Sequence, residues 1–211
     1  MIFDPTEVGE VYEPAEDSDL LAEAAREHVS SGDLTLDVGT GSGYVAGAAA
    51  TTGARVVASD VNPHACRRAR ERYGHGRERA KGTAPDRAGT DGEGATPVEV
   101  VRADLSVPFA AEAFDAVLFN PPYLPTDPDD ERDDWMATAL SGGEDGRAVV
   151  SAFLDDLPRV LAPGGFALLL VSTLTDVEAV VDLADEAGFA AVAVREESFP
   201  FETLTVLKLV R

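Results

Sequence analysis

Cysteine is almost absent from this chain of 211 residues, which contains Cys66 alone. A single cysteine excludes an internal disulfide and any zinc site built from several cysteines. Long apolar runs are absent too, because none reaches the ~20 residues that span a bilayer. Met1 to Pro5 carry neither the basic nor the apolar stretch of a secretory signal. We therefore expect a cytoplasmic protein that makes no membrane contact. The histidines are scattered, so we predict no metal site; they are His28, His64 and His75.

Lysine is also scarce, since only Lys81 and Lys208 occur, and 39 acidic residues oppose 17 basic ones for a net charge of -22. Nucleic-acid binding relies on Lys and Arg side chains that displace counterions from phosphates, so this balance disfavours a nucleic-acid partner. Such a charge also destabilises the compact state by self-repulsion unless salt screens it. The composition is typical of a protein from a halophilic organism. A surface for a basic partner is the alternative.

The rest of the pattern alternates short β-rich runs with helical stretches, which is typical of a doubly wound parallel sheet in an α/β protein. The length fits one domain over residues 1–211. We predict strands at 34–38, 55–60, 98–102, 114–119, 166–172, 190–196 and 203–209, and helices at 16–29, 44–52, 63–73, 148–161 and 177–187. Residues 74–97 are rich in glycine and charge and poor in large apolar side chains, which predicts a flexible insertion within the domain.

A glycine-rich turn, Asp37-Val38-Gly39-Thr40-Gly41-Ser42-Gly43, follows the first predicted strand directly. Glycines at such a turn let the backbone approach a ligand closely and adopt positive φ. The spacing differs from the dinucleotide fingerprint, because Tyr44 stands where G-x-G-x-x-G requires glycine. The Asp37 carboxylate would repel a pyrophosphate but suits a cationic ligand. The turn therefore favours a nucleoside that carries no phosphate and tolerates positive charge, and S-adenosylmethionine has these properties.

Two further carboxylates come at the ends of the next predicted strands. Asp60 ends the second strand, where α/β nucleoside-binding folds place a carboxylate for the ribose hydroxyls. Asp104 and Leu105 follow the third strand, where an adenine ring would find an apolar contact and a polar edge. Each aspartate could instead cap a helix. Three of them at successive strand ends, where open α/β sheets bind ligands, favour a cofactor site for S-adenosylmethionine.

The run Asn120-Pro121-Pro122-Tyr123 lies just past the fourth predicted strand. Prolines fix φ and lack an N–H group, so this loop is rigid and presents carbonyl oxygens. The Asn120 side-chain oxygen and the Pro121 carbonyl form two acceptors for the two hydrogens of a planar –NH2 group, and the Tyr123 ring offers a stacking face. An ordinary turn is the alternative. Beside a methyl donor, these four residues predict catalysis of nitrogen methylation.

Together these motifs resemble the class I, S-adenosylmethionine-dependent methyltransferases that modify exocyclic or amide nitrogens, and more narrowly their archaeal and eukaryal HemK-like branch. The narrower resemblance lies in Val11 to Ser18, Asn120 to Pro125, Ser141 to Arg147 and Leu204 to Lys208. It implies a Rossmann-like fold with a seven-stranded, mostly parallel sheet and an antiparallel strand near the C-terminus. It also implies a protein-(glutamine-N5) methyltransferase that acts on the Gly-Gly-Gln motif of class 1 peptide-chain release factors.

The resemblance carries roles to matching positions. It implies that Asn120 and the Pro121 carbonyl grip the substrate amide, and that Tyr123 lies beside it. The family usually has glutamate where Asp37 stands, so this shorter side chain would reach the methionine ammonium through water. The implied cofactor-binding residues are Ser18, Asp37, Gly39, Gly41, Gly43, Asp60, Asp104, Leu105 and Asn120.

The resemblance also implies a small zinc-binding activator subunit and hence a heterodimer. If the strand 98–102 is outermost in the sheet, it can be extended by a strand of that partner. A solvent-exposed edge strand in a monomer is the alternative. Trp135, at the end of the acidic stretch 126–135, either lines the substrate mouth or packs that loop down.

Two other functions stay open. The first is methylation of adenine N6 in nucleic acid or of a protein lysine, because Asn-Pro-Pro-Tyr suits adenine equally well. The second is a scaffold that binds the cofactor without turnover, although intact Asn120 and Pro121 argue against it.

Overall fold

The computed structural model describes residues 11–73, 98–127 and 134–211. The predicted insertion at 74–97 and the middle of the acidic stretch, 128–133, lie outside the described residues. Among the described residues, no helix combines the length and the apolar character needed to cross a membrane.

Seven strands of the described chain form one sheet in the order β3-β2-β1-β4-β5-β7-β6. Neighbouring strands from β3 to β5 pair in parallel, and β7 pairs antiparallel with both β5 and β6. The predicted fold class is therefore confirmed. The strands are β1 Leu34–Val38, β2 Arg55–Asp60, β3 Val98–Arg102, β4 Phe114–Phe119, β5 Leu161–Ser172, β6 Ala190–Ser198 and β7 Thr203–Val210.

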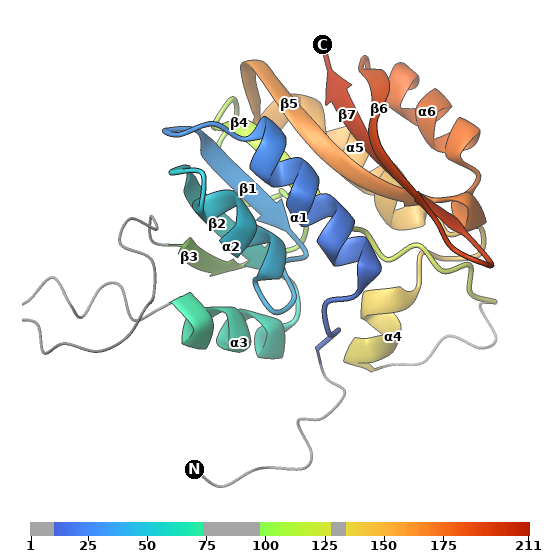
Figure 1. Ribbon diagram of the computed structural model, residues 1–211, viewed down its shortest axis with the longest axis horizontal. Coiled ribbons are helices and arrows are strands. Elements are labelled where there is room, and N and C mark those ends of the chain that lie inside the picture. The colour runs from blue at the N-terminus through green and yellow to red at the C-terminus, as the bar shows by residue number, and fades with distance from the viewer. Residues whose placement is uncertain (1–10, 74–97, 128–133) are drawn as a thin grey trace, which may run out of the picture.

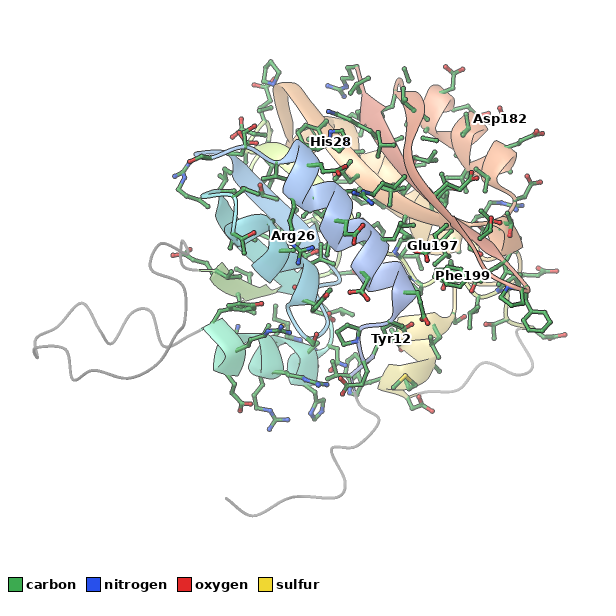
Figure 2. All side chains as sticks on the ribbon, in the orientation of Figure 1. Tyr12, Arg26, His28, Asp182, Glu197 and Phe199 are labelled. Atoms are coloured by element: carbon green, nitrogen blue, oxygen red, sulfur yellow. The ribbon has the colours of Figure 1, made fainter. Side chains whose placement is uncertain are left out.

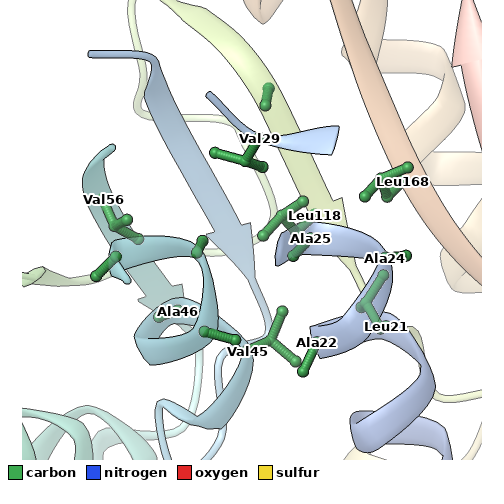
Figure 3. Packing of buried hydrophobic residues seen from close by; sticks show 14 of the residues in the cluster. Leu21, Ala22, Ala24, Ala25, Val29, Val45, Ala46, Val56, Leu118 and Leu168 are labelled. Atoms are coloured by element: carbon green, nitrogen blue, oxygen red, sulfur yellow. The ribbon is translucent and has the colours of Figure 1, made fainter. Parts of the chain in front are cut away.

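Helices cover both faces of this sheet (Figure 1). On one face, α1 and α2 pack against alternate strand residues such as Ala116 and Leu118 of β4 (Figure 3). On the other face, α5 and α6 pack against the intervening residues, including Val117 and Phe119. The helices are α1 Glu16–His28, α2 Tyr44–Ala50, α3 Pro63–Tyr73, α4 Trp135–Leu140, α5 Ala148–Val160 and α6 Val177–Glu186, with a short 3-10 helix, η3, at Thr173–Thr175.

The alternation of side chains along a strand also places the polar residues of β1. Leu36 and Val38 face the α5 side and are buried there. Because successive side chains of a strand point to opposite faces, Asp37 faces the side of α2. The alternation along β1 thus determines toward which face of the sheet the buried Asp37 carboxylate points.

Two elements differ most from the sequence-based expectation, whereas most of the others match it or differ only by one or two residues at an end. Helix α4 lies in a stretch that we expected to be loop, and β5 begins at Leu161 rather than at Phe166. Residues Pro163 to Gly165 fall within β5 as an irregularity in its pairing with β4, where Gly164 takes a φ of 81°. The first of these differences matters for function, because α4 lines the cavity described next.

Candidate active site

A cavity of about 590 Å³ opens at the carboxyl ends of β1, β2, β3 and β4. Here the chain order reverses between β1 and β4, and open α/β sheets bind ligands at such switch points. Of the predicted site residues, these line the cavity: Ser18, Asp37, Gly39, Gly41, Asp60, Asp104, Leu105, Asn120, Pro121, Pro122 and Tyr123. The structure therefore brings the predicted cofactor and acceptor residues, except Gly43, to one cavity.

The glycine turn after β1 has the predicted left-handed backbone. The φ angles are 62° at Gly39, 53° at Gly41 and 79° at Gly43. Gly43 does not line the cavity. It precedes α2, and a Cβ there would lie 2.8 Å from the ring of Tyr73 on α3. The first two glycines line the cavity, whereas the third allows α2 and α3 to pack closely.

Asp37 is buried, with 2% of its surface exposed. Its Oδ2 accepts hydrogen bonds from Thr40 Oγ1 at 2.5 Å and from the backbone N–H of Ala46 at 3.1 Å. The second of these caps the N-terminus of α2, so the helix-capping alternative correctly describes part of what Asp37 does. Burial raises the pKa of the Asp37 carboxyl to about 7, against the smaller effect of these two hydrogen bonds.

Asp60 joins the glycine turn to the start of α3. Its Oδ2 accepts from the N–H of Gly41 at 2.9 Å and its Oδ1 from the N–H of Asn62 at 2.8 Å. Burial raises the pKa of Asp60, although these backbone donors favour its ionised form. Asp104 is exposed at the cavity rim, and Leu105 next to it has an unusual positive φ of 45°. Carboxylates of two neighbouring strands thus meet at the glycine turn, with a third at the rim.

Asn120 follows β4 on the opposite side of the cavity. Its Nδ2 donates to Oδ2 of Asp17 at 3.1 Å. Its Oδ1 is buried and has no hydrogen-bond partner among the described residues. An unpaired buried acceptor is costly, so one that lies in a cavity indicates a position at which a ligand donates a hydrogen bond. Tyr123 is half-buried beside it, and burial, with a smaller effect of the Asp17 charge, raises the pKa of its hydroxyl.

The segment from Ser141 to Arg147 supports the Asn-Pro-Pro-Tyr loop from behind. The N–H of Gly142 donates to the Leu124 carbonyl at 2.9 Å, and a Cβ on Gly146 would lie 2.6 Å from the Tyr123 carbonyl oxygen. Arg147 in turn donates to the Thr175 carbonyl at 2.9 Å. These glycines are needed because two backbone segments pass in close contact behind the acceptor loop.

The chain as a whole is similar to known proteins. The chain is 34% identical, over 94% of its length and 90% of the relative, to a Methanocaldococcus jannaschii protein named as a putative protein N5-glutamine methyltransferase. Our chain belongs to this family. Residues 36–121 match the model of a methyltransferase domain. The human methyltransferase HEMK2 is 28% identical over 96% of this chain and 90% of its own.

The fold of this chain is also similar to that of a solved structure. It is the E. cuniculi Mtq2-Trm112 complex, described as responsible for methylation of the translation termination factor eRF1. It matches with a TM-score of 0.71 and 25% identity, over 96% of this chain and 99% of that one. Methyltransferases of this class use S-adenosylmethionine, so membership of the family identifies S-adenosylmethionine as the cofactor.

Several cavity residues of this methyltransferase escaped the sequence-based prediction. Tyr12 lines the cavity from the segment that enters α1, Asp17 from the first turn of α1, and Ser42 from the glycine turn. The Ser42 hydroxyl is buried and has no partner within the described part of the chain. Trp135, by contrast, is a residue for which the sequence leaves two alternatives, lining the substrate mouth or packing the loop down. It lies on α4 and lines the cavity, with its ring 6.5 Å from that of His64 in an edge-on arrangement. Asp17 could have been predicted as a cavity residue because it stands beside Ser18 in the Glu-Asp-Ser run. No residue pattern indicated α4.

The raised pKa of Asp37 predicts a pH-dependent stability. An ordinary aspartate has a pKa near ~4, so between about pH 4 and pH 7 the folded protein holds a proton that the unfolded chain has lost. The contribution of this group to stability therefore falls as pH rises through that window, by up to about 1.4 kcal/mol for each pH unit. Asp37→Asn keeps the acceptor oxygen without the charge. We expect its Tm, relative to that of the unsubstituted protein, to increase from pH 5 to pH 8.

The control for this measurement is Asp155→Asn, because Asp155 is exposed on α5. Its Tm should follow that of the unsubstituted protein at both pH values. An equal difference between Asp37→Asn and the unsubstituted protein at pH 5 and pH 8 would contradict the assignment.

Proposed function

We propose that this protein methylates the side-chain amide nitrogen of the glutamine in the Gly-Gly-Gln motif of a class 1 peptide-chain release factor. The observation that carries the proposal is the buried, unpartnered Oδ1 of Asn120 in a rigid, proline-fixed loop of the described chain. A side-chain amide has two N–H donors, which is what this loop is built to accept. Membership of the glutamine methyltransferase family supports the same substrate class.

The residues of the cavity fit S-adenosylmethionine. The Asp60 carboxylate is held by the glycine turn and can also accept from ribose hydroxyls, and the buried Ser42 hydroxyl offers a further polar contact. We assign Asp37 to the side of the positively charged methionine group and Leu105 with Asp104 to the adenine. When bound, the cofactor supplies a methyl cation equivalent: the carbon–sulfur bond breaks as the nitrogen–carbon bond forms, the sulfur keeps the electron pair, and the nitrogen then loses one proton.

The part of the chain is to hold the acceptor nitrogen in line with that methyl group. Asn120 Oδ1 and the Pro121 carbonyl accept from the two N–H groups, which raises electron density on nitrogen and fixes its orientation. Tyr123 covers the planar amide. An amide nitrogen has a very high pKa, so a dedicated general base brings little. Positioning supplies most of the rate enhancement, and well-oriented reactions gain ~7–11 kcal/mol in this way.

A methyl-transfer assay tests the substrate. The protein, with and without the activator subunit, is incubated with labelled S-adenosylmethionine and either a release factor or RNA. We expect label on the release factor, located by mass spectrometry on the glutamine of Gly-Gly-Gln and lost when that glutamine is replaced by alanine. Label on lysine or on adenine would overturn the proposal in favour of those substrates. No label on any substrate, with the cofactor bound, would favour a non-catalytic scaffold.

We further propose that a small zinc-binding activator pairs with β3, as a heterodimer. The solved E. cuniculi relative is a complex of Mtq2 with Trm112. Among the described residues, β3 is the edge strand of the sheet on the side of the proposed cofactor residues, and Val101 on it is 37% exposed. An edge strand presents unpaired backbone groups that a partner strand can complete.

Substitution at this edge separates the heterodimer from a monomer with a solvent-exposed strand. Val101→Glu should prevent co-elution with the activator, because it places a charge in an apolar contact. Val192→Glu is the matched control, since Val192 is 54% exposed on β6 at the opposite edge. Both variants should keep the Tm within a few degrees. Unchanged co-elution of Val101→Glu would place the partner elsewhere.

The acid-rich composition leads us to propose a cytoplasm of high salt as the working environment. A net charge of -22 repels itself, and molar salt shortens the Debye length to ~3 Å.

A further inference from the structure

We propose that Asp17 is a positioning residue that holds the Asn120 side-chain amide in the one orientation able to accept a hydrogen bond from the substrate. This inference rests on the proposed function and adds a residue to it. Asp17 acts through Asn120, and it is one of two residues, with Ser18, by which α1 takes part in the cavity.

The two ends of the Asn120 side-chain amide differ in their hydrogen bonding. One end is a donor and the other an acceptor, and a rotation of about 180° about the last side-chain bond exchanges them. The substrate amide is itself a pair of donors. If Asn120 presented Nδ2 to it, two donors would face each other and the nitrogen would be held by one acceptor at most. Catalysis therefore requires that one of the two orientations be excluded.

Asp17 excludes the orientation in which Asn120 presents Nδ2 to the substrate, and it does so by its hydrogen-bonding chemistry rather than by steric hindrance. An ionised carboxylate can accept but not donate, so only the Nδ2 end of Asn120 can face it. The contact is 3.1 Å long, and Asp17 is 5% exposed. The other carboxylate oxygen, Oδ1, accepts from the backbone N–H and the hydroxyl of Ser18, which fixes the carboxylate in turn. The Oδ1 of Asn120 is then left buried and unpartnered within the described chain.

The surroundings of Asp17 keep this contact away from bulk solvent. Tyr12 lies where the chain enters α1 (Figure 2), and it lines the same cavity as Asp17 and Asn120. The pKa of Tyr12 is raised to about 12 by burial first and then by the Asp17 carboxylate. The same charge contributes, after burial, to the raised pKa of the Tyr123 hydroxyl. Asp17 is thus flanked by two tyrosines, which reduces screening of its contact with Asn120.

An exchange of the two side chains tests the inference. Asn120→Asp alone puts two carboxylates in contact, and we expect kcat to fall at least ~100-fold. In the double variant Asp17→Asn with Asn120→Asp, the amide introduced at position 17 donates to the carboxylate introduced at position 120, which again presents an acceptor oxygen to the substrate. We expect the double variant to regain at least ~10-fold of the lost kcat, since the donor–acceptor pairing is restored. A residue that merely stabilised α1 would give no such rescue.

The outcomes are distinct. All variants should bind S-adenosylmethionine within a few-fold of the unsubstituted protein, and Glu16→Gln, which removes an exposed carboxylate next to Asp17, should keep full kcat. If the unsubstituted protein fails to methylate a release factor, the proposed function is wrong. If it succeeds and the double variant is no faster than Asn120→Asp, the role of Asp17 is wrong. Should Asn120→Asp fail to fold, Asp17→Ala decides: a kcat reduced ~10-fold at unchanged cofactor affinity supports the role, and an unchanged kcat refutes it.

Discussion

Asn120→Ala should lower kcat for methyl transfer by at least about 100-fold, which is the loss seen when one preorganised polar contact is removed from a buried reaction site. The substitution removes the Oδ1 acceptor and leaves the substrate nitrogen held by the Pro121 carbonyl alone. It leaves unchanged the glycine turn and Asp60, which line the cavity and which we propose bind the cofactor. We therefore expect the dissociation constant for S-adenosylmethionine to stay within a few-fold, measured by calorimetry.

A control on the same loop makes this result specific. Thr126 lies three residues beyond Tyr123, outside the cavity, and Thr126→Ala should leave kcat unchanged. Substantial turnover by Asn120→Ala would contradict the assigned role and move attention to the backbone carbonyls of the loop. Loss of cofactor binding in Asn120→Ala would instead indicate that the residue contacts the cofactor more than the substrate.

Gly146→Ala should impair both stability and turnover. Gly146 has a φ of 75°, and an alanine there bears about 1–2 kcal/mol of backbone strain. In addition its Cβ would lie 2.6 Å from the Tyr123 carbonyl oxygen, so one of the two backbone segments must move. A displacement of ~1 Å at the acceptor loop is enough to lower kcat by up to about 100-fold. The two effects are measured by thermal unfolding and by the methyl-transfer assay.

Gly188→Ala separates strain from displacement. Gly188 ends the α6 region with a φ of 86°, and a Cβ there meets nothing within 4 Å. It should therefore lose stability by strain alone, at about 2–4 °C of Tm for each kcal/mol in a chain of this size, and keep its kcat. Equal kcat values for the two variants would show that the contact behind Tyr123 does not govern the acceptor loop.

The sheet and the cofactor side of the cavity could be predicted because their signals are local. Each strand is a short apolar run, and Asp37, Asp60 and Asp104 each come at or just after the end of such a run. In a parallel sheet the carboxyl ends of these runs must meet at one edge. Local pattern and topology together therefore bring residues from distant parts of the chain into one cavity.

The remaining features depend on contacts that local patterns do not carry. Helix α4 has six residues, none of them fully buried, so it shows no apolar periodicity. The contact between Asp17 and Asn120 joins positions 103 residues apart. Gly43 was grouped with its two neighbours in the turn, whereas its surroundings are set by Tyr73 of a different helix. In each case the decisive partner lies on another element.

The cavity is divided between the two sides of the switch point, and this division bears on how the methyl acceptor of such an enzyme can be changed. The residues that we propose for the cofactor come largely from the ends of β1, β2 and β3, whereas those that we propose for the acceptor come from the loop after β4. We therefore expect that replacing residues 120–147 with the matching segment of another methyltransferase can change the methyl acceptor, while the residues proposed for the cofactor stay the same. Asp17 would have to be exchanged together with that segment, because it contacts Asn120, although it lies 103 residues earlier in the chain.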